Sequence, residues 1–175
     1  MRQNSSVPAI TASPSPGGFE IELTEPPGTT QLFSADSPAK VPVADDAPAG
    51  VYQVRVRQVS GDDRTIPGPW STVQEIQKLP GPPTVDTATF AGVVDEVGTI
   101  HVAWSGVTSP TGFQVEVTSP FGQVQEHAEP ASPADIRVAA FLDPVPPFEV
   151  RVRAVGADDR TIPGAWSPSK TVEVT

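Results

Sequence analysis

The sequence predicts an all-β chain built from two tandem β-sandwiches, of which the first lacks its first strand. A long segment occurs twice: residues 54–71 read VRVRQVSGDDRTIPGPWS, and 96 positions further on residues 150–167 read VRVRAVGADDRTIPGAWS. The 22 prolines and 14 glycines among 175 residues interrupt helices, and apolar residues do not recur at helical spacing over several turns. Short runs of alternating polarity, separated by turn formers, indicate strands instead.

The second half of the chain contains the complete set of strands. Strict alternation places Ile100, Val102 and Trp104 on one buried face, because successive side chains of a strand point to opposite sides. The same kind of pattern predicts seven strands, at 85–94, 98–105, 113–118, 123–127, 134–141, from 150 onwards, and 170–174. Seven short strands are typical of a β-sandwich.

The sequence Asp-Asp-Arg-Thr-Ile-Pro-Gly occurs at 62–68, which we name loop 1, and at 158–164, which we name loop 2. It is too polar and too rich in turn formers to continue the preceding strand. We therefore expect each copy to be a strand, a loop and the start of the returning strand.

The first half of the chain aligns with the second in pieces. GFEIELT (18–24) matches GFQVEVT (112–118), and SPAKVPVA (37–44) matches SPADIRVA (132–139). The same alignment puts residues 4–11 on the second strand, with Ile10 at the place of Trp104, and leaves no room for a first strand.

A missing first strand leaves its neighbour as an open sheet edge, which invites strand addition by a partner. The candidate docking residues on this edge are Val7, Pro8 and Ile10. Pro8 lies in this edge strand, and Pro42 lies in the strand that is expected to pair with it. Proline donates no ladder hydrogen bond, so the second interpretation is an edge that its prolines protect from pairing with other chains.

These features predict a truncated domain at 1–79, a stiff Pro/Gly linker at 80–84 (PGPPT) and a complete domain at 85–175.

Several motifs resemble those of fibronectin type III domains. Leu142-x-Pro144-x-x-x-Phe148-x-Val150-x-Val152 is similar to that family's run into its F strand, and Gly164-x-Trp166-Ser167 to its entry into strand G. Trp104 sits where the family places a core tryptophan. The first half keeps the tyrosine of this pattern as Tyr52, whereas Phe148 lacks the hydroxyl that caps the corner. The resemblance implies immunoglobulin-like sandwiches, a fold that hosts many roles.

A narrower resemblance concerns context. Units with Val-Arg-Val-Arg and a Pro-Gly-x-Trp-Ser closure are similar to those on tail-tip and other virion proteins of tailed bacteriophages. This implies a virion location after assembly in the cytoplasm, with other virion proteins, in symmetric multiple copies, as partners. A fragment of a secreted protein would instead be extracellular.

Charge and composition disfavour several classes of function. A net charge of −10 disfavours binding to nucleic-acid phosphates, and the absence of cysteine excludes disulfides and thiolate metal sites. MRQNSSVPAI lacks the apolar core of a secretory signal, and without a run of about 18 apolar residues we expect no membrane insertion.

The two loops hold the candidate binding residues, which are Asp62, Asp63, Arg64, Trp70, Asp158, Asp159, Arg160 and Trp166. Two adjacent aspartates do not supply the five or more oxygens of a calcium site, so we expect no metal and a solvated turn with a salt bridge to Arg64 or Arg160. Identical loops present one tip twice, which would favour a repetitive partner such as a host-surface glycan. Recent duplication explains the identity equally well.

The arginines Arg55, Arg57, Arg151 and Arg153 face outward, beside strands that offer Glu20, Glu22 and Glu116. We expect cross-strand ion pairs, with Trp70 and Trp166 lying over the guanidinium groups. This arrangement is either a structural ladder or a binding face. His101, expected on the outer face, and His127 are too few for a zinc site, and no catalytic motif or cofactor is predicted.

The sequence therefore predicts a non-enzymatic structural or attachment protein of a phage or phage-like particle, which docks by its first domain and projects the second. The alternatives are a spacer pair of a secreted polysaccharide-degrading enzyme and a carbohydrate-binding module.

Overall fold

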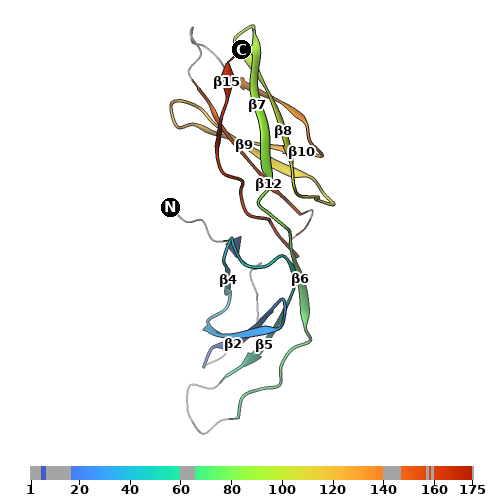
Figure 1. Cartoon of the computed structure of the whole chain (residues 1–175). Helices are drawn as coiled ribbons and strands as arrows, with labels where there is room; N and C mark the ends of the chain where they lie inside the picture. The colour runs from blue at the N-terminus through green and yellow to red at the C-terminus, as the bar shows by residue number, and fades with distance from the viewer. Residues whose placement is uncertain are drawn as a thin grey trace. The chain divides into compact units, whose positions relative to one another are not determined.

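The computed structural model describes residues 5–6, 17–59, 66–139, 147–156, 158 and 160–174, with side chains described between 17 and 172. These residues form strands and turns and no helix, as Figure 1 shows, so the predicted all-β fold class is confirmed. Within this described part of the chain, no helix has the length and apolarity needed to cross a membrane.

The chain divides into two compact units. The first comprises Met1–Leu79 together with Ala157–Ile162, and the second comprises Pro80–Gly156 together with Pro163–Thr175. Six residues that follow the second Val-Arg-Val-Arg strand therefore belong to the first unit, which the repeat alone does not indicate.

The second unit is a two-sheet sandwich. Its strands are β7 (Thr84–Val94), β8 (Val97–Ser105), β9 (Phe113–Thr118), β10 (Val124–Glu129), β11 (Ala134–Ala139), β12 (Glu149–Ala154), β14 (Lys170–Thr171) and β15 (Glu173–Val174). One sheet has the order β11-β8-β7-β15 and the other the order β10-β9-β12-β14. This is the immunoglobulin-like arrangement that the resemblance to fibronectin type III domains implies.

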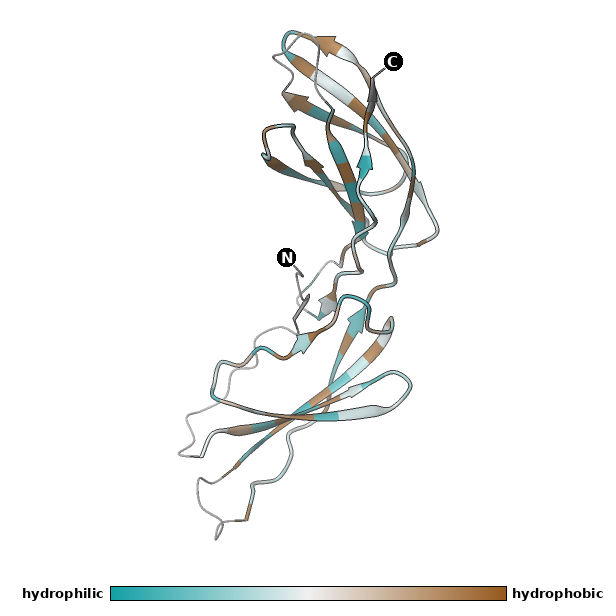
Figure 2. Cartoon of the chain, turned by 60° about the vertical axis from the view of Figure 1, so that its left-hand side comes forward, coloured by the Kyte–Doolittle hydropathy of each residue, from teal (hydrophilic) through white to brown (hydrophobic). Residues whose placement is uncertain are grey.

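The core of this sandwich lies between the two sheets. Ile100, Val102 and Trp104 are at most 5% exposed, which confirms the predicted inward face of β8. Trp104 contacts Phe113 of the opposite sheet edge-on, with ring centroids 5.3 Å apart. Figure 2 shows the resulting alternation of hydrophobic and hydrophilic bands along the strands.

The first unit has β1 (Ser5–Ser6), β2 (Phe19–Glu25), β3 (Thr29–Ala35), β4 (Pro42–Val43), β5 (Gly50–Gln58), β6 (Gln74–Lys78) and β13 (Thr161–Ile162). A five-stranded sheet runs in the order β13-β6-β5-β2-β3, and β1 pairs with β4. The core cluster contains the buried residues Ile21, Leu23, Val41, Val43, Tyr52, Val54, Ile76 and Ile162.

The pairing of β1 with β4 corresponds to the pairing of β8 with β11, so β1 occupies the second-strand position. Ser5 stands opposite Val43, and in the second unit Gly98 stands opposite Val138. The alignment drawn from the sequence, with residue 4 at the place of residue 98, is therefore displaced by one residue. Val7, Pro8 and Ile10 lie outside the described residues.

Tyr52 closes the corner that leads into β5. Its ring is fully buried, and its hydroxyl donates a 2.8 Å hydrogen bond to the carbonyl oxygen of Pro48. Removing only the hydroxyl, as in Tyr52→Phe, is expected to lower the free energy of unfolding of the first unit by about 1 kcal/mol. Urea unfolding measures this change, and an unaltered midpoint would show that the bond contributes nothing.

Candidate interaction site

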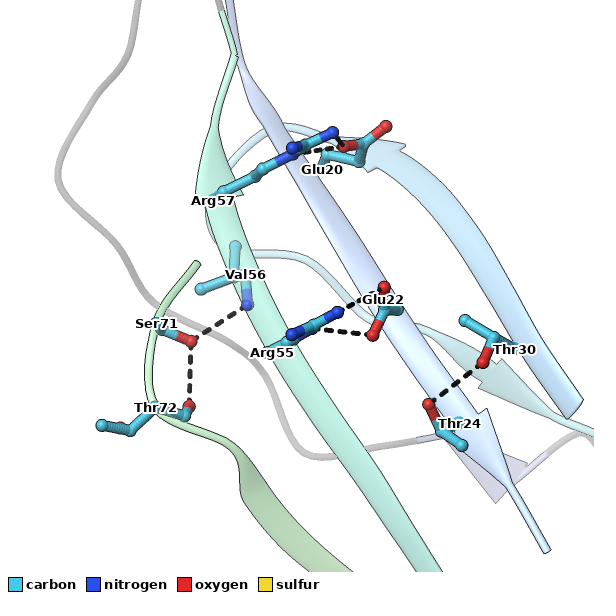
Figure 3. A network of polar contacts seen from close by, with 9 residues as sticks. All are labelled: Glu20, Glu22, Thr24, Thr30, Arg55, Val56, Arg57, Ser71 and Thr72. Atoms are coloured by element: carbon cyan, nitrogen blue, oxygen red, sulfur yellow. Dashed lines mark hydrogen bonds and ion pairs between the residues drawn. The ribbon is translucent and has the colours of Figure 1, made fainter. Parts of the chain in front are cut away.

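The outer face of the large sheet in the first unit carries an arginine ladder, shown in Figure 3. Arg55 on β5 donates from Nε and Nη2 to the two carboxylate oxygens of Glu22 on β2, at 2.7 and 3.0 Å. Arg57 donates from Nε to Glu20 at 2.6 Å. The centroid of Trp70 lies 4.8 Å from the guanidinium carbon of Arg55 and 4.5 Å from that of Arg57. The hydrogen bond to Glu22 raises the pKa of Arg55 above its usual value.

The second unit repeats this ladder with one change. Arg151 binds both oxygens of Glu116, at 2.7 and 2.8 Å, and Arg153 donates to the amide oxygen of Gln114 at 2.8 Å in place of a carboxylate. Trp166 lies 4.6 and 4.3 Å from the two guanidinium carbons.

The predicted cross-strand ion pairs and cation–π contacts are therefore confirmed. Solvent screens the exposed ion pairs, so the ladder contributes more to the rigidity of the sheet than to its stability. Trp70 and Trp166 thus have a packing role in both units, and a binding role for them stays a prediction.

Both loops rise from the same hydrogen-bonded stem. In the first unit the N–H of Val56 donates to the hydroxyl of Ser71 at 3.0 Å, and the N–H of Ser71 donates to the carbonyl oxygen of Val56 at 2.8 Å. Val152 and Ser167 make the same two bonds, at 2.9 and 2.8 Å. The Trp-Ser pair therefore fixes the returning chain to the edge of the Val-Arg-Val-Arg strand.

The two serines differ in burial, since Ser167 is 4% exposed and Ser71 is exposed. Ser167→Ala leaves the buried N–H of Val152 without its hydroxyl acceptor, and we expect a loss of about 1–2 kcal/mol. Water can replace the hydroxyl of Ser71, so Ser71→Ala is expected to cost less than about 0.5 kcal/mol. Amide exchange at Val152 and Val56 measures both effects, and equal acceleration at the two sites would contradict the role of burial.

Beyond the stem the two loops diverge. Ile162 of loop 2 is 1% exposed in the core of the first unit, whereas Ile66 of loop 1 is 90% exposed. Loop 2 is held by main-chain bonds, because the N–H groups of Gln77 and Leu79 donate to the carbonyl oxygens of Arg160 and Ile162 at 2.9 and 3.0 Å. The expectation of a loop without strand structure between the two strands is therefore wrong at Thr161–Ile162, which form β13.

Strand β13 pairs with β6, the last strand of the first unit, at the position that a first strand would otherwise occupy. It runs parallel to β6, with Thr161 opposite Gln77 and Ile162 opposite Lys78. In the second unit the first strand, β7, runs parallel to β15, with Thr89 opposite Glu173 and Phe90 opposite Val174. The 96-residue repeat relates Gln77 to Glu173 and Lys78 to Val174, so Thr161 and Ile162 occupy the positions of Thr89 and Phe90.

Lys78 lies beside this junction. Its side chain is 2% exposed, and its ammonium group donates to the carbonyl oxygens of Asp45 and Ala47 at 2.8 and 2.7 Å. Burial lowers the pKa of Lys78 below its usual value, although the charges of Asp45, Asp46 and Glu25 oppose that change. The lysine thereby fixes the turn that precedes β5.

The remaining predicted site residues are distributed as follows. Asp158 accepts hydrogen bonds from the N–H of Arg160 at 3.1 Å and from the hydroxyl of Thr161 at 2.8 Å, so it holds the turn that leads into β13. Asp62, Asp63, Arg64 and Asp159 lie outside the described residues. His101 is on the outer face, as predicted, with Nδ1 2.8 Å from Asp135. The described ranges contain no group of three or more potential metal ligands.

Sequence reasoning missed Ile162 and Lys78 as parts of this site. For Lys78 a signal exists, because period-2 alternation from Ile76 puts it on the inward face where the second copy has Val174. For Ile162 no local signal exists, since loop 1 has the same seven residues.

Neither a family model nor a curated protein matches this chain. Among solved structures it is similar to a two-domain fibronectin type III segment of chicken tenascin, at 12% identity and a TM-score of 0.38, over 97% of this chain and 99% of that one. It is also similar to the FN1–FN3 domains of chicken CNTN1, at 14% identity and a TM-score of 0.47, over 91% of this chain and 55% of that one. This chain thus spans about half the length of the CNTN1 segment. A cytokine receptor complex chain has 20% identity and a TM-score of 0.36, over 94% of this chain and 89% of that one.

Proposed function

We propose that this chain is a non-enzymatic structural and attachment protein of a phage or phage-like particle. Its first unit docks on the particle, and its second unit carries the attachment surface. Its partners are other virion proteins in symmetric multiple copies, and a host-surface glycan is the candidate ligand.

The completion of the first sandwich by β13 is the observation that carries this proposal. A segment distant in sequence supplies the missing strand through two main-chain hydrogen bonds and one buried isoleucine. Main-chain bonds give affinity and a side-chain pocket gives specificity, which is how strand addition assembles protein subunits. Strand addition within the chain therefore supports a role as one subunit of a larger particle.

Surface chemistry also supports an assembly role. The outward arginines of both ladders are bound by carboxylate or amide oxygens and stacked on tryptophan, so they stiffen the sheets. The net charge of −10 favours docking on a basic surface.

Labelled particles test the proposal. An antibody against the second unit, applied to purified particles from the cell that encodes the chain, is expected to mark symmetry-related positions in electron micrographs. Particles that lack the chain after deletion of its coding sequence serve as the control. Unlabelled wild-type particles, with the chain recovered only in the soluble fraction, would overturn the proposal.

The glycan ligand is tested separately on an array. Trp166→Ala and Trp70→Ala should abolish any signal in which a tryptophan ring stacks on sugar, and circular dichroism confirms that each variant is folded. A signal that survives both changes would place the glycan site elsewhere.

A further inference from the structure

Ile66 is an exposed apolar side chain in a segment whose second copy is buried. Residues 62–68 and 158–164 have the same sequence, yet 90% of Ile66 is exposed and 1% of Ile162. Pro67, which follows Ile66, is exposed as well. Loop 2 therefore shows what this sequence binds when a suitable sheet edge is present.

Every group that loop 2 uses for docking has its counterpart in loop 1. The contacts to β6 are made by the carbonyl oxygens of Arg160 and Ile162, and the isoleucine side chain enters the core. Asp158 organises the approach through the N–H of Arg160 and the hydroxyl of Thr161. At the corresponding positions loop 1 has Asp62, Arg64, Thr65 and Ile66.

The acceptor for such a segment is the first-strand position along β6. In the second unit the equivalent position is filled by that unit's own β7, which pairs with β15. In the first unit no strand described within residues 1–79 fills it, and β13 does so instead.

We propose that loop 1 docks, through Ile66, at the first-strand position of another molecule of this chain, parallel to β6 as β13 is. The inference rests on the proposed function, because it names the partner and the contact through which multiple copies associate. Exchange of loop 2 for loop 1 of a neighbour replaces one set of contacts by an identical set.

Mass action decides which loop occupies the position. A segment tethered to its own acceptor has an effective concentration of about 1 mM, so loop 2 prevails in dilute solution. In an array of copies the local concentration of loop 1 reaches that range, and neighbours become linked.

The absence of cysteine from the chain makes a direct test possible. Thr65→Cys in one sample and Gln77→Cys in another place the two thiols at positions that correspond to the Thr161–Gln77 pair. After mixing at about 1 mM, a short bis-maleimide is expected to give a hetero-dimer. A single chain with Thr161→Cys and Gln77→Cys should cross-link internally and calibrates the reagent.

Ile66→Asp, added to the Thr65→Cys protein, is the matched control. It should lower the yield of hetero-dimer about tenfold or more, the factor that corresponds to burial of one isoleucine side chain. A yield that Ile66→Asp leaves unchanged, or that does not exceed the yield from Thr72→Cys with Gln77→Cys, would overturn the inference.

A second measurement does not depend on exchange with loop 2. Adding Ile162→Asp to the Gln77→Cys protein weakens the tethered competitor, so at about 0.1 mM, where loop 2 otherwise prevails, the hetero-dimer yield should rise about fivefold. If the protein with Ile162→Asp unfolds, the Gln77→Cys protein without that change still tests whether loop 1 docks beside β6. Because cross-linking uses purified chain alone, its failure is separate from an absence of the chain from particles.

Discussion

Ile162→Ala is expected to lower the free energy of unfolding of the first unit by about 2–4 kcal/mol, while Ile66→Ala changes it by less than about 0.5 kcal/mol. The two substitutions delete the same atoms from the same seven-residue sequence. Only the surroundings differ, since Ile162 is 1% exposed and Ile66 is 90% exposed.

The large effect at Ile162 has two physical sources. Alanine buries less apolar surface on folding than isoleucine does. The truncation also leaves a cavity among residues such as Tyr52 and Ile76. A weakened β13 also exposes the N–H groups of Gln77 and Leu79, which lose their acceptors.

Amide exchange locates the effect. Exchange at Leu23 and Val54, both in the core cluster of the first unit, should accelerate in Ile162→Ala and stay unchanged in Ile66→Ala. Val115 and Val152 report on the core of the second unit and should change little. Equal effects of the two alanine substitutions would contradict the docking of β13.

The strands were predictable because their pattern is local. Alternation placed Ile100, Val102 and Trp104 inward, and the same period put Arg55 and Arg151 opposite Glu22 and Glu116. Each of these features needs only the period of a strand and the pairing of neighbours.

The destination of loop 2 was not predictable from its residues. Loops 1 and 2 are identical, so any rule that reads only local sequence assigns them one structure. Their difference arises from a distant cause, the position beside β6 that the described strands of residues 1–79 leave for Ile162. The sequence did indicate that this unit lacks a strand. It predicted either that a partner chain completes the sheet or that prolines protect the open edge.

The second large effect concerns Lys78, whose replacement by methionine is expected to destabilise the first unit by about 2–4 kcal/mol at pH 7. Methionine retains most of the side-chain volume, so little cavity forms. The loss arises because the carbonyl oxygens of Asp45 and Ala47 no longer receive the ammonium hydrogen bonds. Lys40 is exposed, and Lys40→Met should have no measurable effect on urea unfolding.

The pH dependence of the Lys78→Met effect has a defined sign. Burial lowers the pKa of Lys78 in the folded state below its usual 10.5. Between the lowered value and 10.5 the unfolded chain holds more protons at this site than the folded chain, so the lysine's contribution to stability rises with pH. The pKa of Tyr52 is raised by burial and by Glu25, which lowers stability above pH 10, but this term is common to both proteins. The difference in stability between wild type and Lys78→Met should therefore widen as the pH rises from the lowered pKa of Lys78 towards 10.5. Urea unfolding of both proteins across this range measures the difference, and a difference that narrowed would contradict the lowered pKa of Lys78 in the folded state.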